Sequence, residues 1–87
     1  NYAMAALQRE CSTLASTSAG RNNQCNASAY SIGQLVGGGL LDQDHAVACL
    51  VDAGVLTGLP ERDVRAAVAS GMRAGMGKPR VAPKRDR

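Results

Sequence analysis

The residues best suited to bind a ligand stand together in the stretch Gly20-Arg21-Asn22-Asn23. Glycine and asparagine are typical of a helix start, where the first backbone N–H groups have no partner within the helix and the helix dipole is positive. Such an end binds phosphate or carboxylate, and a neighbouring arginine adds a bidentate charged contact. The competing interpretation is that Asn22 or Asn23 only caps the helix and that Arg21 pairs with an acid such as Glu61 or Asp63.

Three polar residues that follow at spacings of four, Asn22, Asn26 and Tyr30, share one helix face. This face suits a nucleotide, with amide contacts from the asparagines and a base stacked on Tyr30. The alternative role for Asn26 is to satisfy backbone groups of the preceding loop. Because the chain has no Phe or Trp, a larger stacking platform for single strands is disfavoured.

Further basic residues gather towards the C-terminus. Residues 1–77 carry five basic and six acidic groups, whereas residues 78–87 carry five basic groups and one acid, so a near-neutral body precedes a basic tail. We expect a phosphate-binding ridge with salt-dependent, sequence-independent affinity, formed by Arg62, Arg65, Arg73, Lys78 and Arg80. The alternatives are a solvated helix face and a solvated linker.

Metal and nucleophile chemistry find little support. His45 and Cys49 lie four residues apart, but a zinc site needs two further ligands, and only Cys11 and Cys25 offer thiols. We therefore expect no metal, no cofactor and no catalytic residue, and simple burial of the cysteines. An odd cysteine count without CxxC spacing favours a reducing cytoplasm. No apolar run approaches the ~20 residues that span a bilayer, and we expect no signal peptide.

The hydrophobic pattern predicts an all-α fold, a small bundle of about four short helices. The first helix covers 4–15, with Met4 on its apolar stripe, and the second begins at Asn22 or Asn23 and ends at the glycines 37–39. Asp42 caps the third, which ends near 53–54, and the fourth begins at Pro60 and fades at 75–77. Val55 and Leu56 are expected to tuck under the bundle. We expect one domain at 4–77 and a basic tail or linker at 78–87. Whether residues 1–3 are a remnant of cloning stays open.

Residues 20–77 resemble a known family through three motifs in order, GRNNQCN, AYSIGQLVGGGLL and VACLVDAGVLTGLPERDVRAAVASGMRAG. This family is the helical primase C-terminal domain, which follows the catalytic primase-polymerase or Toprim module in phage and plasmid replication proteins. The chain departs from the family pattern at Cys25, where a leucine-like residue is expected, and at Gly37-Gly38, which loosen a helix end.

The resemblance implies a non-catalytic accessory domain of a larger replication enzyme. Such a domain contacts template or primer DNA, or couples the primase to a helicase. Its partners would be single-stranded or primer-template DNA and the other modules of the replication protein. An alternative of another class is a protein-interaction or inter-module spacer domain with no nucleic-acid contact, which the near-neutral body also fits.

Overall fold

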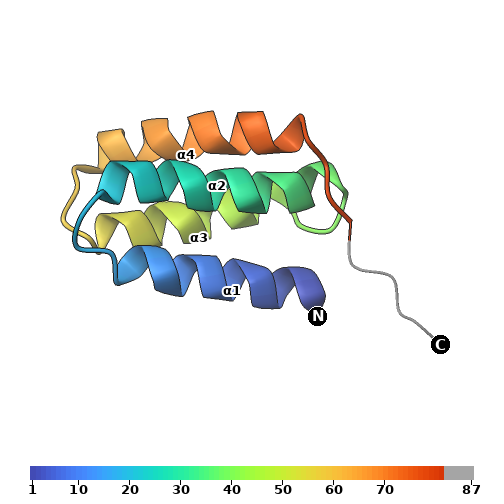
Figure 1. Cartoon of the computed structure of the whole chain (residues 1–87), viewed down its shortest axis with the longest axis horizontal. Coiled ribbons are helices and arrows are strands. Elements are labelled where there is room, and N and C mark those ends of the chain that lie inside the picture. The colour runs from blue at the N-terminus through green and yellow to red at the C-terminus, as the bar shows by residue number, and fades with distance from the viewer. Residues whose placement is uncertain (82–87) are drawn as a thin grey trace.

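The structure, a computed structural model, describes residues 1–81, so the predicted tail residues Lys84, Arg85 and Arg87 lie outside the described part. Four helices follow one another: α1 (Tyr2–Ala15), α2 (Arg21–Gly37), α3 (Gln43–Val55) and α4 (Glu61–Met76) (Figure 1). Within residues 1–81 there is no strand. The predicted small all-α bundle is therefore confirmed.

Local sequence explains how three of the helices begin. The Asn1 side chain accepts a hydrogen bond from the Met4 backbone N–H at 2.8 Å, and the Asp42 side chain accepts from the His45 N–H at 2.9 Å. The predicted cap of α3 is thus confirmed. Pro60 precedes α4 as its N-cap, with ψ 141°, so the prediction that it is the first helical residue was wrong by one position.

The first helix begins earlier than its predicted start at Met4. Helix α1 begins at Tyr2, and Ala3 is buried one turn before Leu7. Met4 is 39% exposed, so its predicted place on the buried stripe was wrong. The buried stripe of α1 runs through Ala3, Ala6, Leu7 and Leu14, and Met4 lies beside it, partly exposed.

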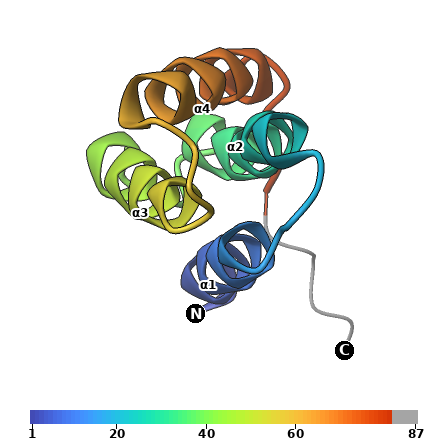
Figure 2. The same cartoon turned by 90° about the vertical axis from the view of Figure 1, so that its left-hand side faces the viewer.

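Helix α2 is the centre of the bundle and contacts α1, α3 and α4 (Figure 2). Its approach to α4 is the closest, because Gly33 and Gly37 of α2 meet the backbone of Met72 and Met76, while Gly71 and Gly75 of α4 meet the backbone of α2. A Cβ atom at Gly33 would lie 2.6 Å from the Met72 carbonyl oxygen. The two helices therefore pack backbone against backbone along about two turns.

The turn between α3 and α4 departs from the sequence-based expectation. Val55 is 40% exposed and Leu56 is 75% exposed, so neither is buried under the bundle. Helix α3 continues to Val55. The backbone N–H groups of Thr57 and Gly58 donate to the carbonyls of Gly54 and Val55, and Gly58 has a φ of 94°. Val55 and Leu56 therefore lie on the surface, at the C-terminal end of α3.

Candidate nucleic-acid interface

The start of α2 differs from the starts of the other helices. Gly20 is its N-cap with a left-handed φ of 65°, no side chain caps the helix, and its first turn contains no acid. The first helical hydrogen bond runs from the Gln24 N–H to the Gly20 carbonyl at 2.9 Å. The prediction that Asn22 or Asn23 caps the helix was wrong, because both lie inside its first turn. The α2 dipole thus ends in N–H groups that no side chain neutralises.

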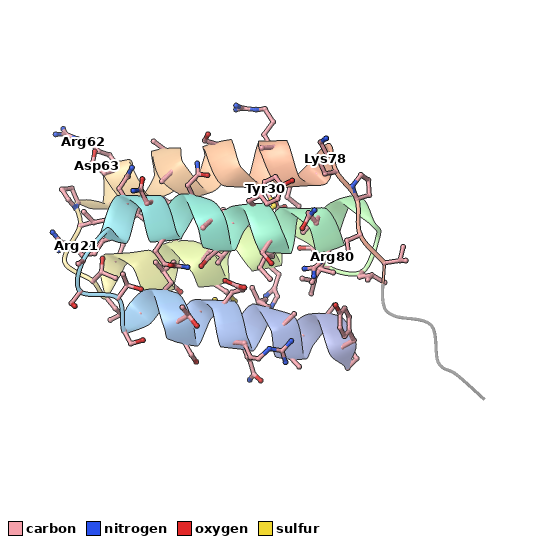
Figure 3. All side chains as sticks on the ribbon, in the orientation of Figure 1. Arg21, Tyr30, Arg62, Asp63, Lys78 and Arg80 are labelled. Atoms are coloured by element: carbon pink, nitrogen blue, oxygen red, sulfur yellow. The ribbon has the colours of Figure 1, made fainter. Side chains whose placement is uncertain are left out.

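Arg21, the first residue of α2, is held across the bundle end. Its Nη1 donates to the Thr57 carbonyl oxygen at 2.8 Å, in the turn before α4. Within residues 1–81 it forms no ion pair, so the alternative of a salt bridge to Glu61 or Asp63 is not realised. A carbonyl oxygen orients the guanidinium but leaves its full positive charge, and its other N–H groups stay available for an anion. Figure 3 shows Arg21 at the same end of the bundle as Arg62 and Asp63.

A shallow hollow of about 440 Å³ opens at this helix start. Asn22 and Asn23 are exposed on its rim, and Arg21 is half-buried beside them. Its lining comes from the loop before α2, from the first turn of α2 and from one residue of the turn before α4, namely Ser18, Ala19, Gly20, Arg21, Asn22, Asn23 and Leu59. The hollow therefore combines unpaired backbone donors, amide side chains and a guanidinium.

The predicted nucleotide face is divided by the packing of α4. Asn26 and Tyr30 are half-buried, and their backbone carbonyls face Gly71 and Gly75. Tyr30 lies nine residues beyond Arg21, about 13 Å along the helix. Asn22 remains at the open end, so the structure does not bring Tyr30 to the hollow.

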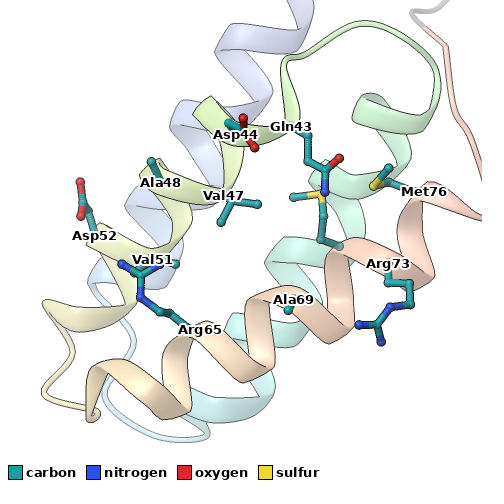
Figure 4. A pocket seen from close by; sticks show the side chains of 11 residues that line it. Gln43, Asp44, Val47, Ala48, Val51, Asp52, Arg65, Ala69, Arg73 and Met76 are labelled. Atoms are coloured by element: carbon teal, nitrogen blue, oxygen red, sulfur yellow. The ribbon is translucent and has the colours of Figure 1, made fainter.

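Arg65 and Arg73 belong to another surface, on the side of α4 that faces α3. Arg65 is paired with Glu61, its Nε lying 2.7 Å from the carboxylate oxygen, whereas Arg73 is exposed. Both line a groove between α3 and α4 together with Asp44 and Asp52 (Figure 4). The acids on the facing wall make this groove mixed in charge.

The two basic residues after α4 lie at the opposite end of the bundle from Arg21 (Figure 3). The Arg80 backbone N–H donates to the Gln34 carbonyl at 2.9 Å, and its Nη2 lies 3.3 Å from both oxygens of Ser31. Arg80 is therefore bound to α2, and Lys78 is exposed. Because Ser31 follows Arg21 by ten residues, the two basic ends are about 15 Å or more apart.

Cys25 is buried, as expected, whereas Cys11 and Cys49 are only half-buried. Burial, followed by the neighbouring Cys49, Glu10 and Asp52, raises the pKa of the Cys11 thiol to about 11, and burial also raises the pKa of Cys25. Cys49 Sγ lies 3.7 Å from His45 Nε2. Within residues 1–81 no group of three His, Cys, Asp or Glu side chains is placed to hold a metal ion. None of the four described helices combines the length and apolar character needed to cross a bilayer.

Two features escaped the sequence analysis. The hydrogen bond from Arg21 to Thr57 joins residues 36 positions apart, and no local pattern signals it. The α3–α4 groove was also missed, although Val47, Val51 and Val55 recur every four residues and mark a second apolar stripe on α3.

Comparisons of this chain with known protein families, with curated proteins and with solved structures give no match.

Proposed function

We propose that this chain is a non-catalytic helical accessory domain of a phage- or plasmid-type DNA primase, and that it contacts template or primer DNA through the start of α2. The order of its sequence motifs, which resembles the helical primase C-terminal domain, supports the assignment to a primase. The observation that carries the DNA contact is the uncapped α2 start beside Arg21.

The α2 start suits a phosphate group better than the other helix starts do. Asn1 and Asp42 already occupy the first N–H groups of α1 and α3, and Glu61 and Asp63 place negative charge in the first turn of α4. A phosphate at α2 would meet free N–H donors, the positive end of the dipole and the Arg21 charge together.

The wider surface favours a polyanion over a small anion. Exposed Lys78 lies beyond the C-terminal end of α2, a helix of 17 residues and hence about 25 Å long. At an axial rise of about 3.4 Å per base pair of duplex DNA, this length matches about seven base pairs. The domain would follow a DNA backbone along α2, with its sequence-independent contacts at the two ends.

Asn22→Asp tests the DNA contact, because it changes the charge at the α2 start without changing the side-chain shape. A carboxylate in the first turn complements the dipole, so the free energy of unfolding should stay equal or rise by about 0.3–1 kcal/mol. The same carboxylate repels phosphate by about 1 kcal/mol at close range, so Kd for single-stranded DNA should rise about fivefold at low salt. Fluorescence anisotropy with a labelled oligodeoxythymidine and urea unfolding measure the two effects.

The matched control is Gln8→Glu, which introduces the same charge on the exposed face of α1. It should change Kd by less than about twofold, since screened charges at a distance interact weakly. The DNA role is refuted if the wild-type domain does not bind at low salt, or if both variants weaken binding equally. The sequence that flanks residues 1–87 tests the primase assignment separately, through polymerase carboxylates upstream or an ATPase loop downstream.

A further inference from the structure

A groove between α3 and α4 leaves apolar side chains open to solvent. Its volume is about 700 Å³, and its floor includes Val47, Val51, Met72 and Met76 (Figure 4). A second hollow of about 420 Å³ shares Val51 with it.

This second hollow extends the groove to the end of α3, where Leu56 stands 75% exposed. Leu56 is the most exposed large apolar side chain among residues 1–81. The same surface thus presents an apolar hollow and a protruding apolar side chain.

The two walls of the groove carry opposite charges. Asp44 and Asp52 line it from α3, and Arg65 and Arg73 line it from α4. The two helices run in opposite directions (Figure 1). Arg65 lines the second hollow together with Asp52, so these two lie at the same level. Asp44 and Asp52 are eight residues apart, and so are Arg65 and Arg73, which corresponds to about 12 Å along either helix. Because the helices are antiparallel, Asp44 then lies level with Arg73.

We propose that a second copy of this chain covers the groove, in a dimer whose two-fold axis runs parallel to it. A rotation about this axis lays α3 of each copy over α4 of the other. Every acid on α3 then faces an arginine on α4 of the partner, and each such pair occurs twice. A two-fold axis across the groove would instead set α3 against α3 and acid against acid. The charge pattern therefore selects the first arrangement.

The same rotation produces a four-helix arrangement. Since α3 and α4 are antiparallel within each copy and the axis preserves their directions, α3 is also antiparallel to α4 of the partner. Every neighbouring pair then has opposed dipoles, as in an up-and-down bundle. The valines of the two α3 helices and Met76 of the two α4 helices would share one apolar core.

The area of the α3–α4 face determines how strongly the two copies should associate. Helix α3 has 13 residues and is about 20 Å long, and two helices side by side are about 20 Å wide. The buried area is then about 400 Å² per copy, or about 800 Å² in total, which is below the roughly 1,200–2,000 Å² of specific, stable interfaces and in the range of weak, transient ones. We therefore expect a weak, reversible dimer with a Kd between about 10 µM and 1 mM.

Sedimentation equilibrium of the whole chain over this concentration range tests the proposal, with Arg73→Glu and Asp44→Lys as variants. Each variant alone sets like charges against each other at two symmetric positions, so its dimer should weaken about tenfold. An equimolar mixture of the two variants should restore wild-type association. In the mixed dimer one pair is native and the other is reversed, so both pairs are attractive again.

Leu56→Asp serves as a second disrupting variant, because a side chain that is 75% exposed can be changed without disturbing the fold. Circular dichroism of every variant checks that the helices are retained. Asn22→Asp, at the far side of the bundle, should leave association unchanged, which keeps this proposal separate from the DNA contact. The proposal is overturned if the wild-type chain stays a 9.0 kDa monomer throughout, or if the mixture associates no better than its components.

Discussion

Replacement of Gly75 by alanine tests the backbone-to-backbone packing of α2 and α4. In most helices this change raises stability, since alanine is favoured over glycine in a helix interior by about 0.5–1 kcal/mol. Here the added Cβ would meet the Tyr30 carbonyl oxygen closer than 3.0 Å and lie 3.0 Å from the Gln34 nitrogen. These are backbone atoms of α2, which cannot rotate away as a side chain would.

The added methyl group can be accommodated only if α4 moves away from α2. Overpacking of a well-packed core costs about 1–3 kcal/mol and sometimes more, and a rigid backbone favours the upper end. After the gain in helix propensity, we expect Gly75→Ala to lower the free energy of unfolding by about 2 kcal/mol. For a domain of this size Tm should fall by about 8–16 °C.

Urea and thermal unfolding followed by circular dichroism measure this effect, and Gly77→Ala is the matched control. Gly77 is the C-cap of α4, its φ is −76°, and a Cβ there would lie 3.4 Å from its nearest neighbour, the Ala74 carbonyl. The control should stay within about 0.5 kcal/mol of wild type. If Gly75→Ala is as stable as the control, or more stable than wild type, the close approach of the two helices is wrong.

Two further predictions concern the α3 cap and the thiols. Asp42→Ala should lower the free energy of unfolding by about 1 kcal/mol in urea titrations, whereas Asp42→Asn, which can still accept from His45 N–H, should cost little; equal losses would contradict a capping role. Because the pKa of Cys11 is raised from 9.0 to about 11, its native thiolate fraction at pH 8 should be about 100-fold below that of an ordinary thiol, and mass spectrometry should show slow iodoacetamide alkylation that becomes fast in urea. The same shift means that its contribution to stability is complete below pH 9 and is lost as pH rises towards 11, so alkaline stability that is flat across this window would contradict it.

The parts of the fold that depend on local sequence were predictable. The Asp42 cap is an example, because a capping side chain and its N–H partner are only three residues apart. The buried positions Val64, Val68 and Met72 of α4 can likewise be read from the sequence, because they follow the helical period. Gly33 leaves room for a second helix, but which helix approaches it, α4, is known only from the structure.

The predictions failed where contacts between distant segments determine which side chains are buried. Met4 fits the apolar period of α1, but the packing of α1 buries Ala3 and leaves Met4 39% exposed. Leu56 was expected to be buried for its apolar character alone, yet the turn between α3 and α4 directs it outwards. The anchor of Arg21 on Thr57 likewise depends on how two distant segments meet. The candidate phosphate-binding residues could thus be named individually from the sequence. Their spacing along the chain could not show that the fold places them on several separate surfaces.

The two proposals together have a geometric consequence for how DNA would meet this domain. A two-fold axis parallel to the α3–α4 groove preserves the direction of every helix that runs along it, and α2 runs alongside these helices (Figure 1). Both α2 starts would therefore lie at the same end of the dimer, each with its own Arg21. Two weak phosphate contacts held in one body act at high effective concentration, so a strand that spans both would bind more tightly than either contact alone allows. A near-neutral domain with one open helix start per copy would in this way gain affinity for a polyanion without a broad basic surface.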